Sequence, residues 1–137
     1  MFNYFSHTQN IDTRFLITDI VRAIKNKEVF KTSVDNIVRD FITPPDFYNL
    51  IQAIIDAKST NIALDCYTKN PVSKFDLLSE LKNKFGLIYD FDENIDTIDA
   101  TGAKVNYYST NKISGNIKYM PDNTSLDGII QEMNCVL

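Results

Sequence analysis

The chain has 137 residues and a formal net charge of −4, and 44% of its residues are hydrophobic. This length allows at most one domain of ordinary size, spanning residues 1–137, and the apolar content argues against disorder. Its 14 basic residues are scattered among 18 acidic ones. Nucleic acid is therefore not expected as a partner, because phosphate backbones are bound by clustered positive charge.

Membrane and metal-binding classes are also disfavoured by the sequence. No apolar run approaches the roughly 20 residues that cross a bilayer, and the first residues lack the basic start of a signal peptide. Cys66 and Cys135 are far apart and form no metal-ligand pair, and His7 is the only histidine. We therefore expect a cytoplasmic protein with reduced thiols, no membrane segment and no metal site.

The first half of the chain predicts two helices separated by an ambiguous segment. Apolar residues recur at helical spacing over 12–27, and lysines near the end complement the helix dipole. Residues 34–42 are ambiguous between strand and turn. Pro44 and Pro45 end that segment, and Pro45 can begin a second helix over about 46–58.

In the second half, short strands alternate with helices. Length and content predict strands at 61–67, 87–91 and 103–108. Ser73 and Asp76 form an acidic capping box that opens a helix reaching about Lys84, and Gly86 fits the position after its end. The spacing Thr124-x-x-Asp127 opens a final helix in the same way. Helices alternating with short strands predict an α/β fold.

Familiar catalytic patterns are weak in this sequence. The four glycines are isolated from one another, whereas a dinucleotide site needs clustered glycines between a strand and a helix. Nothing pairs His7 with a nucleophile, so we interpret it as a surface histidine. Tyr108 and Lys112 have Tyr-x-x-x-Lys spacing, but only two positions define that pattern and no cofactor loop accompanies it. We interpret the pair as an aromatic residue beside a surface lysine, and we expect no catalytic residue and no cofactor site here.

Three stretches carry a family resemblance when they are taken together. They are residues 2–9 (FNYFSHTQ), 39–46 (RDFITPPD) and 109–121 (STNKISGNIKYMP), the last followed by TSLDGI at 124–129. In this order and spacing they resemble the C-terminal half of the extended short-chain dehydrogenases/reductases, which include the NAD-dependent nucleotide-sugar epimerases and dehydratases. That family has an N-x-Y-G-P-x-Q-like turn, an R-D-[FY]-I-H-V-x-D motif and an S-x-x-K segment ending in G-[YW]-x-P.

The resemblance covers nearly the whole chain and has structural implications. It implies the C-terminal, substrate-binding portion of a Rossmann-type fold, with the N-terminal dinucleotide-binding part absent. It also implies a short helix rather than a strand at 110–117. The sequence departs from the family at three places: Thr43 stands where a histidine is usual, residues 6–8 replace the Gly-Pro turn, and Gly115 is shifted relative to the aromatic residue.

The resemblance assigns candidate substrate-binding residues one by one. Arg39 matches the family arginine that contacts the substrate diphosphate, a role suited to its planar fork of donors. Asn3 matches an asparagine near the phosphates or the sugar. Asp46 matches the second acid of the motif, and we interpret it as stabilising the start of the helix there. Asp40 is a candidate for a structural ion pair with Arg39, and an ordinary surface or structural arginine is the alternative interpretation of Arg39.

The leading hypothesis is the nucleotide-sugar-binding part of an NAD-dependent epimerase or dehydratase, truncated or split and inactive alone. The family's Gly-rich loop and catalytic Tyr-x-x-x-Lys would precede Met1, so NAD is expected only in a full-length relative. The family packs this half against a nucleotide domain, so we expect a homo-oligomer or a missing N-terminal half as partner, burying Phe2, Tyr4, Phe5 and a helix face. The alternative is a small acidic interaction protein, such as an inhibitor or immunity protein for a basic partner.

Overall fold

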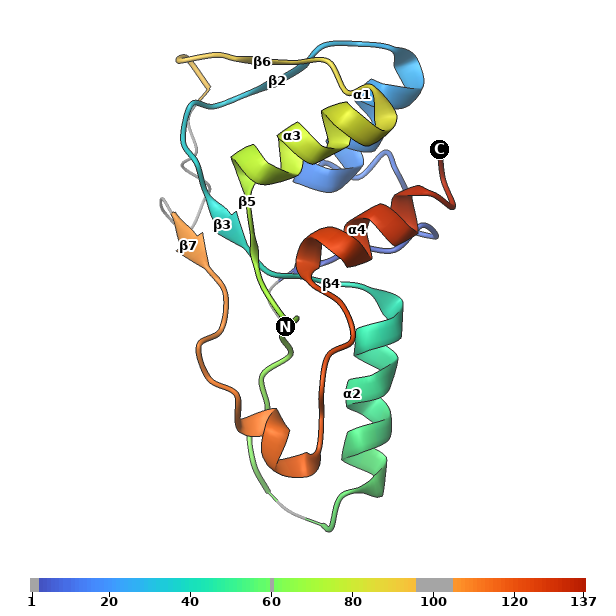
Figure 1. Ribbon diagram of the computed structural model, residues 1–137, viewed down its shortest axis with the longest axis vertical. Coiled ribbons are helices and arrows are strands. Elements are labelled where there is room, and N and C mark those ends of the chain that lie inside the picture. Colours follow the sequence, from blue (N-terminus) through green and yellow to red (C-terminus); the bar gives the residue numbers. More distant parts are fainter. Residues whose placement is uncertain (1–2, 60, 96–104) are drawn as a thin grey trace.

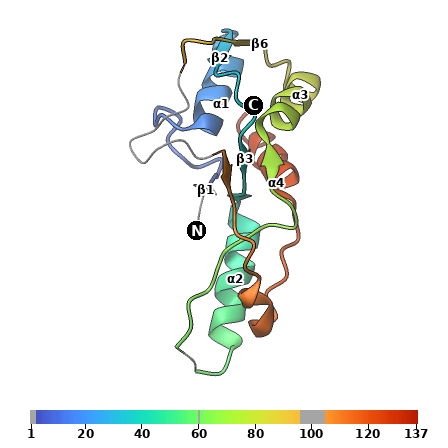
Figure 2. The same ribbon diagram turned by 90° about the vertical axis from the view of Figure 1, so that its left-hand side faces the viewer.

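The computed structural model describes residues 3–59, 61–95 and 105–137. The chain is α/β and elongated, with helices α1, α3 and α4 towards one end and helix α2 and the 3-10 helix η1 towards the other (Figures 1 and 2). The helices are α1 (Leu16–Asn26), α2 (Pro44–Asp56), α3 (Lys74–Phe85), η1 (Ile113–Ile117) and α4 (Ser125–Met133). The strands are β1 (Asn3–Tyr4), β2 (Phe30–Thr32), β3 (Val38–Arg39), β4 (Phe41–Ile42), β5 (Val72–Ser73), β6 (Tyr89–Phe91) and β7 (Asn106–Tyr107).

Short, mostly parallel strand pairings tie distant parts of the chain to the segment 38–42. Strand β1 pairs in parallel with β4, and β3 pairs in parallel with β7 and antiparallel with β5. A separate parallel pair joins β2 to β6. Only Asp40 separates β3 from β4, so one short segment contacts the N-terminus on one side and residues 72–73 and 106–107 on the other.

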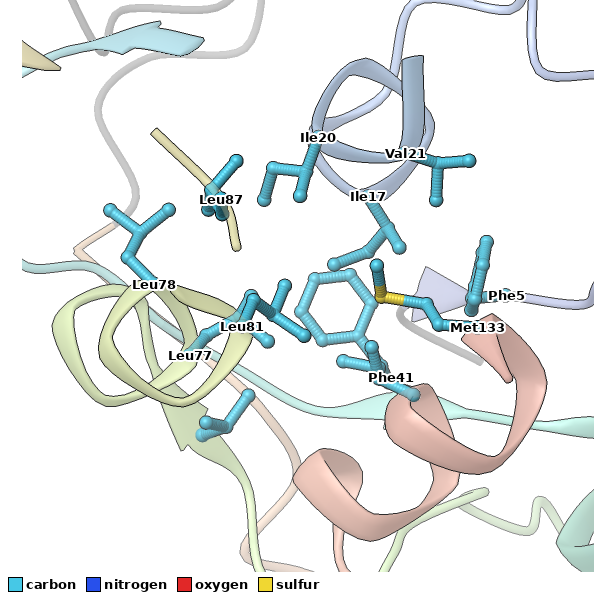
Figure 3. Close-up of a cluster of buried hydrophobic side chains, with 12 residues drawn as sticks. Phe5, Ile17, Ile20, Val21, Phe41, Leu77, Leu78, Leu81, Leu87 and Met133 are labelled. Atoms are coloured by element: carbon cyan, nitrogen blue, oxygen red, sulfur yellow. The ribbon is translucent and has the colours of Figure 1, made fainter. Parts of the chain in front are cut away.

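Two groups of buried side chains hold the elements together. In the larger one, the rings of Phe5, which follows β1, and Phe41 of β4 meet aliphatic residues of α1, α3 and α4, as Figure 3 shows. Its fully or nearly fully buried members are Phe5, Ile17, Ile20, Val21, Phe41, Val72, Leu77, Leu78, Leu81, Leu87, Ile129 and Met133. The smaller group, Ile42, Leu50, Cys66, Tyr67 and Tyr119, packs α2 against the segments that flank η1. Burial of this apolar surface is the main force that places α2 and α4 on the 38–42 segment.

Helix ends in the second half follow the predicted capping chemistry. The Ser73 hydroxyl accepts a hydrogen bond from the Asp76 N–H at 3.1 Å, and α3 ends at Gly86 with a left-handed φ of 69°. The Thr124 hydroxyl accepts from the Asp127 N–H at 3.1 Å and begins α4. These predictions are confirmed because each depends only on residues three or four positions apart.

The two helices of the first half are present with shifted starts. Helix α2 begins at Pro44, because two prolines can occupy the first turn, where no N–H partner is needed. Helix α1 begins at Leu16 rather than at residue 12. Hydroxyls hold the preceding residues in turns: Thr13 Oγ1 donates to the Asn10 carbonyl, and Thr18 Oγ1 donates to the Thr13 carbonyl, each at 2.6 Å.

The predicted strand at 61–67 is wrong: those residues have no strand pairing in the structure. Side chains satisfy the backbone there instead. Ser114 Oγ donates to the Asp65 carbonyl at 2.6 Å, and Tyr119 Oη donates to the Tyr67 carbonyl at 2.7 Å. Sequence content cannot reveal such partners, because they lie about 50 positions further along the chain.

The remaining expectations are met in part. The strand expected at 87–91 is β6, and the one expected at 103–108 is β7, with residues 103–104 outside the described residues. The short helix implied at 110–117 is η1. Within the described residues, no helix is long and apolar enough to cross a membrane.

The expected contact surface at the N-terminus needs a correction. Phe5 is only 2% exposed and belongs to the larger core, so it packs within its own chain rather than against a partner. Tyr4 is 39% exposed and lies edge-on to Phe47, with ring centroids 6.0 Å apart. Phe2 lies outside the described residues.

Candidate functional site

A cavity of about 370 Å³ lies where β1, the segment 38–42 and the start of α1 meet. Its walls are mainly apolar and include Phe15, Leu16, Ile37 and Phe41. Three polar side chains that matter for binding also line it, from Asn3, Gln9 and Arg39. A concave, largely apolar space with few convergent polar groups is the usual form of a small-molecule site.

Arg39, the first sequence-predicted site residue, lines this cavity from strand β3. Its guanidinium donates to the carbonyls of Val38 and Val105, at 2.9 and 3.2 Å, and lies 5.9 Å from the centre of the Tyr107 ring. The side chain is half-buried. A half-buried guanidinium in the wall of a cavity can meet an anion, because its planar fork of donors matches the geometry of phosphate oxygens.

Asn3, the second predicted residue, reaches the same cavity from strand β1. The parallel register places Asn3 opposite Phe41, and Asn3 Nδ2 donates to the Asp40 carbonyl at 3.2 Å. Its side-chain oxygen can still accept, and its amide has a second hydrogen to donate. The structure therefore brings both predicted residues to one cavity, although they are far apart in the sequence.

Asp40 and Asp46 serve the scaffold. The Asp40 carboxylate is buried and accepts from Thr68 Oγ1 at 2.5 Å, from the Thr68 N–H at 3.1 Å and from Ser125 Oγ at 2.7 Å. The carboxylate of Asp40 is therefore paired with Thr68 and Ser125 and not, as predicted, with Arg39. Neighbouring residues in an extended segment point to opposite sides, so Arg39 faces the cavity while Asp40 faces α4.

Asp46 lies in the first turn of α2, as predicted for a residue that stabilises this helix start, and it is fully buried. Its carboxylate also accepts the backbone N–H groups of Asp122 and Asn123, at 2.6 and 3.1 Å. The second acid of the motif thus fastens the segment before α4 to the start of α2. It does not line the cavity.

The start of α1 adds a feature that favours anions at the cavity. Its N-cap residue is Phe15, which supplies no side-chain acceptor for the first-turn N–H groups. Leu16, Ile17 and Thr18 of that turn line the cavity. A helix N-terminus carries partial positive charge, so this end of the cavity and Arg39 attract the same kind of ligand.

A buried lysine lies close to this region but has a structural task. Lys74, 2% exposed at the start of α3, donates from Nζ to the Ser33 carbonyl at 2.7 Å and to Ser33 Oγ at 2.9 Å. Burial lowers the pKa of Lys74 below its ordinary value. The ammonium therefore ties the turn after β2 to α3.

The weaker sequence patterns have structural explanations. Tyr108 and Lys112 do not share a helix, since η1 begins only at Ile113, and the Lys112 ammonium lies 3.8 Å from the centre of the Tyr67 ring. His7 is bonded through Nδ1 to Glu132 at 2.7 Å, which links the N-terminal turn to α4. Among the described residues, no group of three His, Cys, Asp or Glu side chains could hold a metal ion.

The three glycines that the structure describes do not form a dinucleotide site either. Gly86 ends α3, Gly115 lies in η1 and Gly128 lies inside α4, while Gly102 is outside the described residues. In the part of the chain that the structure describes, no helix therefore begins at a glycine-rich turn that would let backbone N–H groups approach a pyrophosphate.

Sequence reasoning missed Gln9 and Phe15 as cavity residues. Gln9 lies within residues 2–9, which carry the family resemblance, but its spacing alone indicates no role in binding. Phe15 lies within the stretch 12–27, whose apolar spacing predicts only a helix. Both lie on the connection between β1 and α1, and only the β1–β4 pairing turns that connection towards Arg39.

Comparison of the whole fold with solved structures gives consistent matches. The UDP-glucuronic acid 4-epimerase from Bacillus cereus, in complex with UDP-glucuronic acid and NAD, superposes with a TM-score of 0.78 at 16% identity, over 98% of this chain and 43% of that one. MoeE5 in complex with UDP-glucuronic acid and NAD gives 0.77 at 16% identity, over 97% and 44%. The UDP-glucose 4-epimerase from Thermotoga maritima with UDP-glucose gives 0.76 at 13% identity, over 97% and 43%.

The chain has the fold of part of a nucleotide-sugar epimerase. This finding supports the predicted α/β class and the resemblance to the extended short-chain dehydrogenases/reductases at the level of fold. The chain spans less than half the length of the epimerases that it matches. No protein-family model and no curated protein sequence matches it.

Proposed function

We propose that this chain binds a nucleoside diphosphate sugar in the cavity between β1, β3 and α1, as the C-terminal, substrate-binding part of an epimerase-like or dehydratase-like protein. The observation that carries the proposal is the convergence of Arg39 and Asn3 on one cavity. The family resemblance assigns the same two residues to substrate binding from the sequence alone. Three structural neighbours are described in complex with UDP-sugars, which makes a UDP-sugar the natural ligand to test.

The physical roles follow from the geometry of the site. Arg39 would give charge-assisted hydrogen bonds to phosphate oxygens, which are stronger than bonds between neutral groups. The first turn of α1 lines the same cavity and favours the same negative charge. Asn3 would add a hydrogen bond from its amide to an oxygen of the phosphate or the sugar.

Catalysis is not part of this proposal. The described glycines do not form a dinucleotide loop, and NAD would be held by a separate polypeptide or a further part of a longer protein. The cavity would then supply substrate recognition alone. Titration with NAD is therefore a useful comparison, and we expect it to give no binding signal with this chain.

The experiment is a calorimetric titration with UDP-glucose and UDP-glucuronic acid. Arg39→Ala should weaken binding roughly 10- to 100-fold, because a charge-assisted hydrogen bond contributes about 1.5–3 kcal/mol. Lys25→Ala is the matched control: it removes one exposed positive charge near the far end of α1 and should leave affinity within about twofold. Melting curves of both variants would separate loss of binding from loss of fold.

Two outcomes would count against the proposal in different ways. Equal affinity of wild type and Arg39→Ala would remove Arg39 from the site and leave the ligand class open. If neither UDP-sugar binds the wild type at millimolar concentration, the proposal that this chain binds a nucleotide-sugar by itself is rejected.

A further inference from the structure

Residues 61–67 run back beside α2 without joining a sheet (Figures 1 and 2). The carbonyls of Asp65 and Tyr67 accept hydrogen bonds from Ser114 Oγ and Tyr119 Oη, at 2.6 and 2.7 Å, and therefore face η1 and its flank. Successive backbone groups of an extended chain point to opposite sides. The backbone groups at the even-numbered positions of this segment therefore form an outer edge that faces away from η1.

This outer edge is unpaired. Among the described residues, the backbone N–H and C=O groups of Ile62 and Leu64 have no hydrogen-bond partner. Ile62 is exposed and Leu64 is half-buried, so a strand can approach them from solvent. An accessible edge with unpaired backbone groups is a template for the addition of another strand.

The side of α2 that faces away from η1 is apolar and exposed. Asn49 and Ala53 line a hollow together with residues of η1. An α-helix turns once in about 3.6 residues, so the opposite side of α2 carries the side chains that lie half a turn away. These are Tyr48, Ile51, Ile54 and Ile55, which are 38–68% exposed. The outer edge and this helix face therefore point to the same side, and one partner can cover both.

The area of this surface fits a second copy of the chain. Ile62 is 46% exposed and lines a hollow with Ile54, so it extends the apolar face of α2 to the strand. The five side chains together expose roughly 400–500 Å² of apolar surface, a size typical of interaction sites. A stable interface covers about 800 Å² on each partner, which the apolar face reaches together with the strand edge and its polar surroundings.

The charges beside this surface favour a second copy over a basic partner. The exposed charged residues of α2 and of the turn that follows it are Asp56 and Lys58, which balance each other although the whole chain has a net charge of −4. A basic partner would find no acidic excess here. Two copies, in contrast, can meet at this near-neutral face without the repulsion that like charges produce.

We infer that two copies of the chain associate about a two-fold axis by pairing residues 61–65 in antiparallel, with their α2 helices side by side on one face of the joined strands. Because the outward backbone groups lie at even positions, hydrogen bonds join Ile62 of one copy to Leu64 of the other. Ala63 then meets its own counterpart at the axis, where its small side chain permits close approach. This association does not depend on nucleotide-sugar binding.

Disulfide cross-linking tests the register. In a Cys135→Ala background, which removes the exposed thiol, Ala63→Cys places two thiols at the axis. The Cα atoms of such a non-hydrogen-bonded pair are about 4.5 Å apart, which is within disulfide reach. Oxidation should convert most of this variant into a covalent dimer. Asn61→Cys is the matched control, because it is also exposed but lies opposite position 65 of the other copy, and it should give about 10-fold less dimer.

Hydrogen exchange of the wild type tests the pairing without any substitution. The amide hydrogens of Ile62 and Leu64 should exchange about 10-fold more slowly when the concentration rises from the low micromolar to the millimolar range, because pairing protects them. The Ala63 amide faces η1 and should change by less than about twofold. Light scattering on the same samples should give the mass of two chains at the higher concentration.

Three results would overturn the inference. The first is the mass of a single chain at millimolar concentration. The second is a dimer in which the Ile62 and Leu64 amides exchange as fast as they do at low concentration, because the copies would then meet at another surface. The third is an equal yield of covalent dimer from Ala63→Cys and Asn61→Cys, because random collision would then explain both. No nucleotide-sugar enters these measurements, so each of these results would leave the proposed function standing.

Discussion

At the scale of single residues, the partners of a charged side chain decide its task. Arg39 and Asp40 are adjacent, yet the first lines the cavity and the second is buried among the hydroxyls of Thr68 and Ser125. Their opposite directions follow from the extended backbone. The sequence identified Arg39 as a candidate from its motif, but it gave no means of finding the hydroxyl partners of Asp40.

Cys66 gives a prediction at this scale. Burial raises the pKa of the Cys66 thiol from 9.0 to about 11, with the nearby charge of Asp40 acting in the same direction. The folded state therefore holds the proton more tightly than the unfolded state does. This contribution to stability is fully present below pH 9 and is lost as the pH rises to about 11. At about 1.4 kcal/mol per pKa unit, the loss is about 2–3 kcal/mol.

The measurement is the free energy of unfolding in urea between pH 8 and pH 11. The decline of the wild type should be steeper than that of Cys66→Ala by this amount. The exposed Cys135, changed to alanine, serves as the control and should follow the wild type. Parallel curves for wild type and Cys66→Ala would contradict the prediction. Burial also raises the pKa of Tyr119, and the nearby charge of Cys66 acts in the same direction, so the difference between the two curves includes the coupling of these two groups.

At the scale of elements, the packing of α4 against the start of α2 depends on one missing side chain. A Cβ at Gly128 would lie 2.7 Å from Thr43 Oγ1 and 3.0 Å from Thr43 Cγ2. Thr43 is 2% exposed and cannot move into solvent. Thr43, which stands where the family usually has a histidine, therefore packs against α4. This close contact explains why position 128, inside that helix, is a glycine.

Gly128→Ala should lower the free energy of unfolding by about 1–3 kcal/mol, because overpacking outweighs the better helix propensity of alanine. In a Thr43→Ala background the same change should become neutral or stabilising by up to about 1 kcal/mol. Urea unfolding of the single and double variants gives the coupling between the two sites. Gly115→Ala is the matched control, since its Cβ would meet only Tyr67 Oη, at 3.8 Å. Additive effects of the changes at positions 43 and 128 would show that the two residues do not clash.

At the scale of the whole molecule, the chain leaves large apolar side chains at its surface. On α2, Tyr48, Ile51 and Ile55 are 62%, 38% and 68% exposed, and their spacing places them on one face of the helix. The matched epimerases are more than twice as long as this chain. An apolar helix face of this kind is typical of a surface that a partner covers.

We expect this face to be buried in a homo-oligomer of the isolated chain. Light scattering after gel filtration should give more than one chain per particle at micromolar concentration. Ile55→Lys should shift the mass towards one chain, because a desolvated lysine would oppose association. Val29→Lys changes an exposed apolar residue away from α2 and should leave the mass unchanged. A single-chain mass for the wild type at all concentrations would contradict the prediction.

The sequence by itself determined the α/β class, the four helices, the caps of α3 and α4, and the candidates Asn3 and Arg39. These depend on short-range rules, in which residues three or four positions apart form one helical face or one cap, or on motifs in a fixed order. The tertiary structure alone decided the rest. Strands of two or three residues are too short to show a period, so the pairing of β1 with β4 could not be read from the sequence. That pairing creates the cavity, turns Gln9 and Phe15 into it and buries Phe5, because contacts between distant segments form only when the whole core closes.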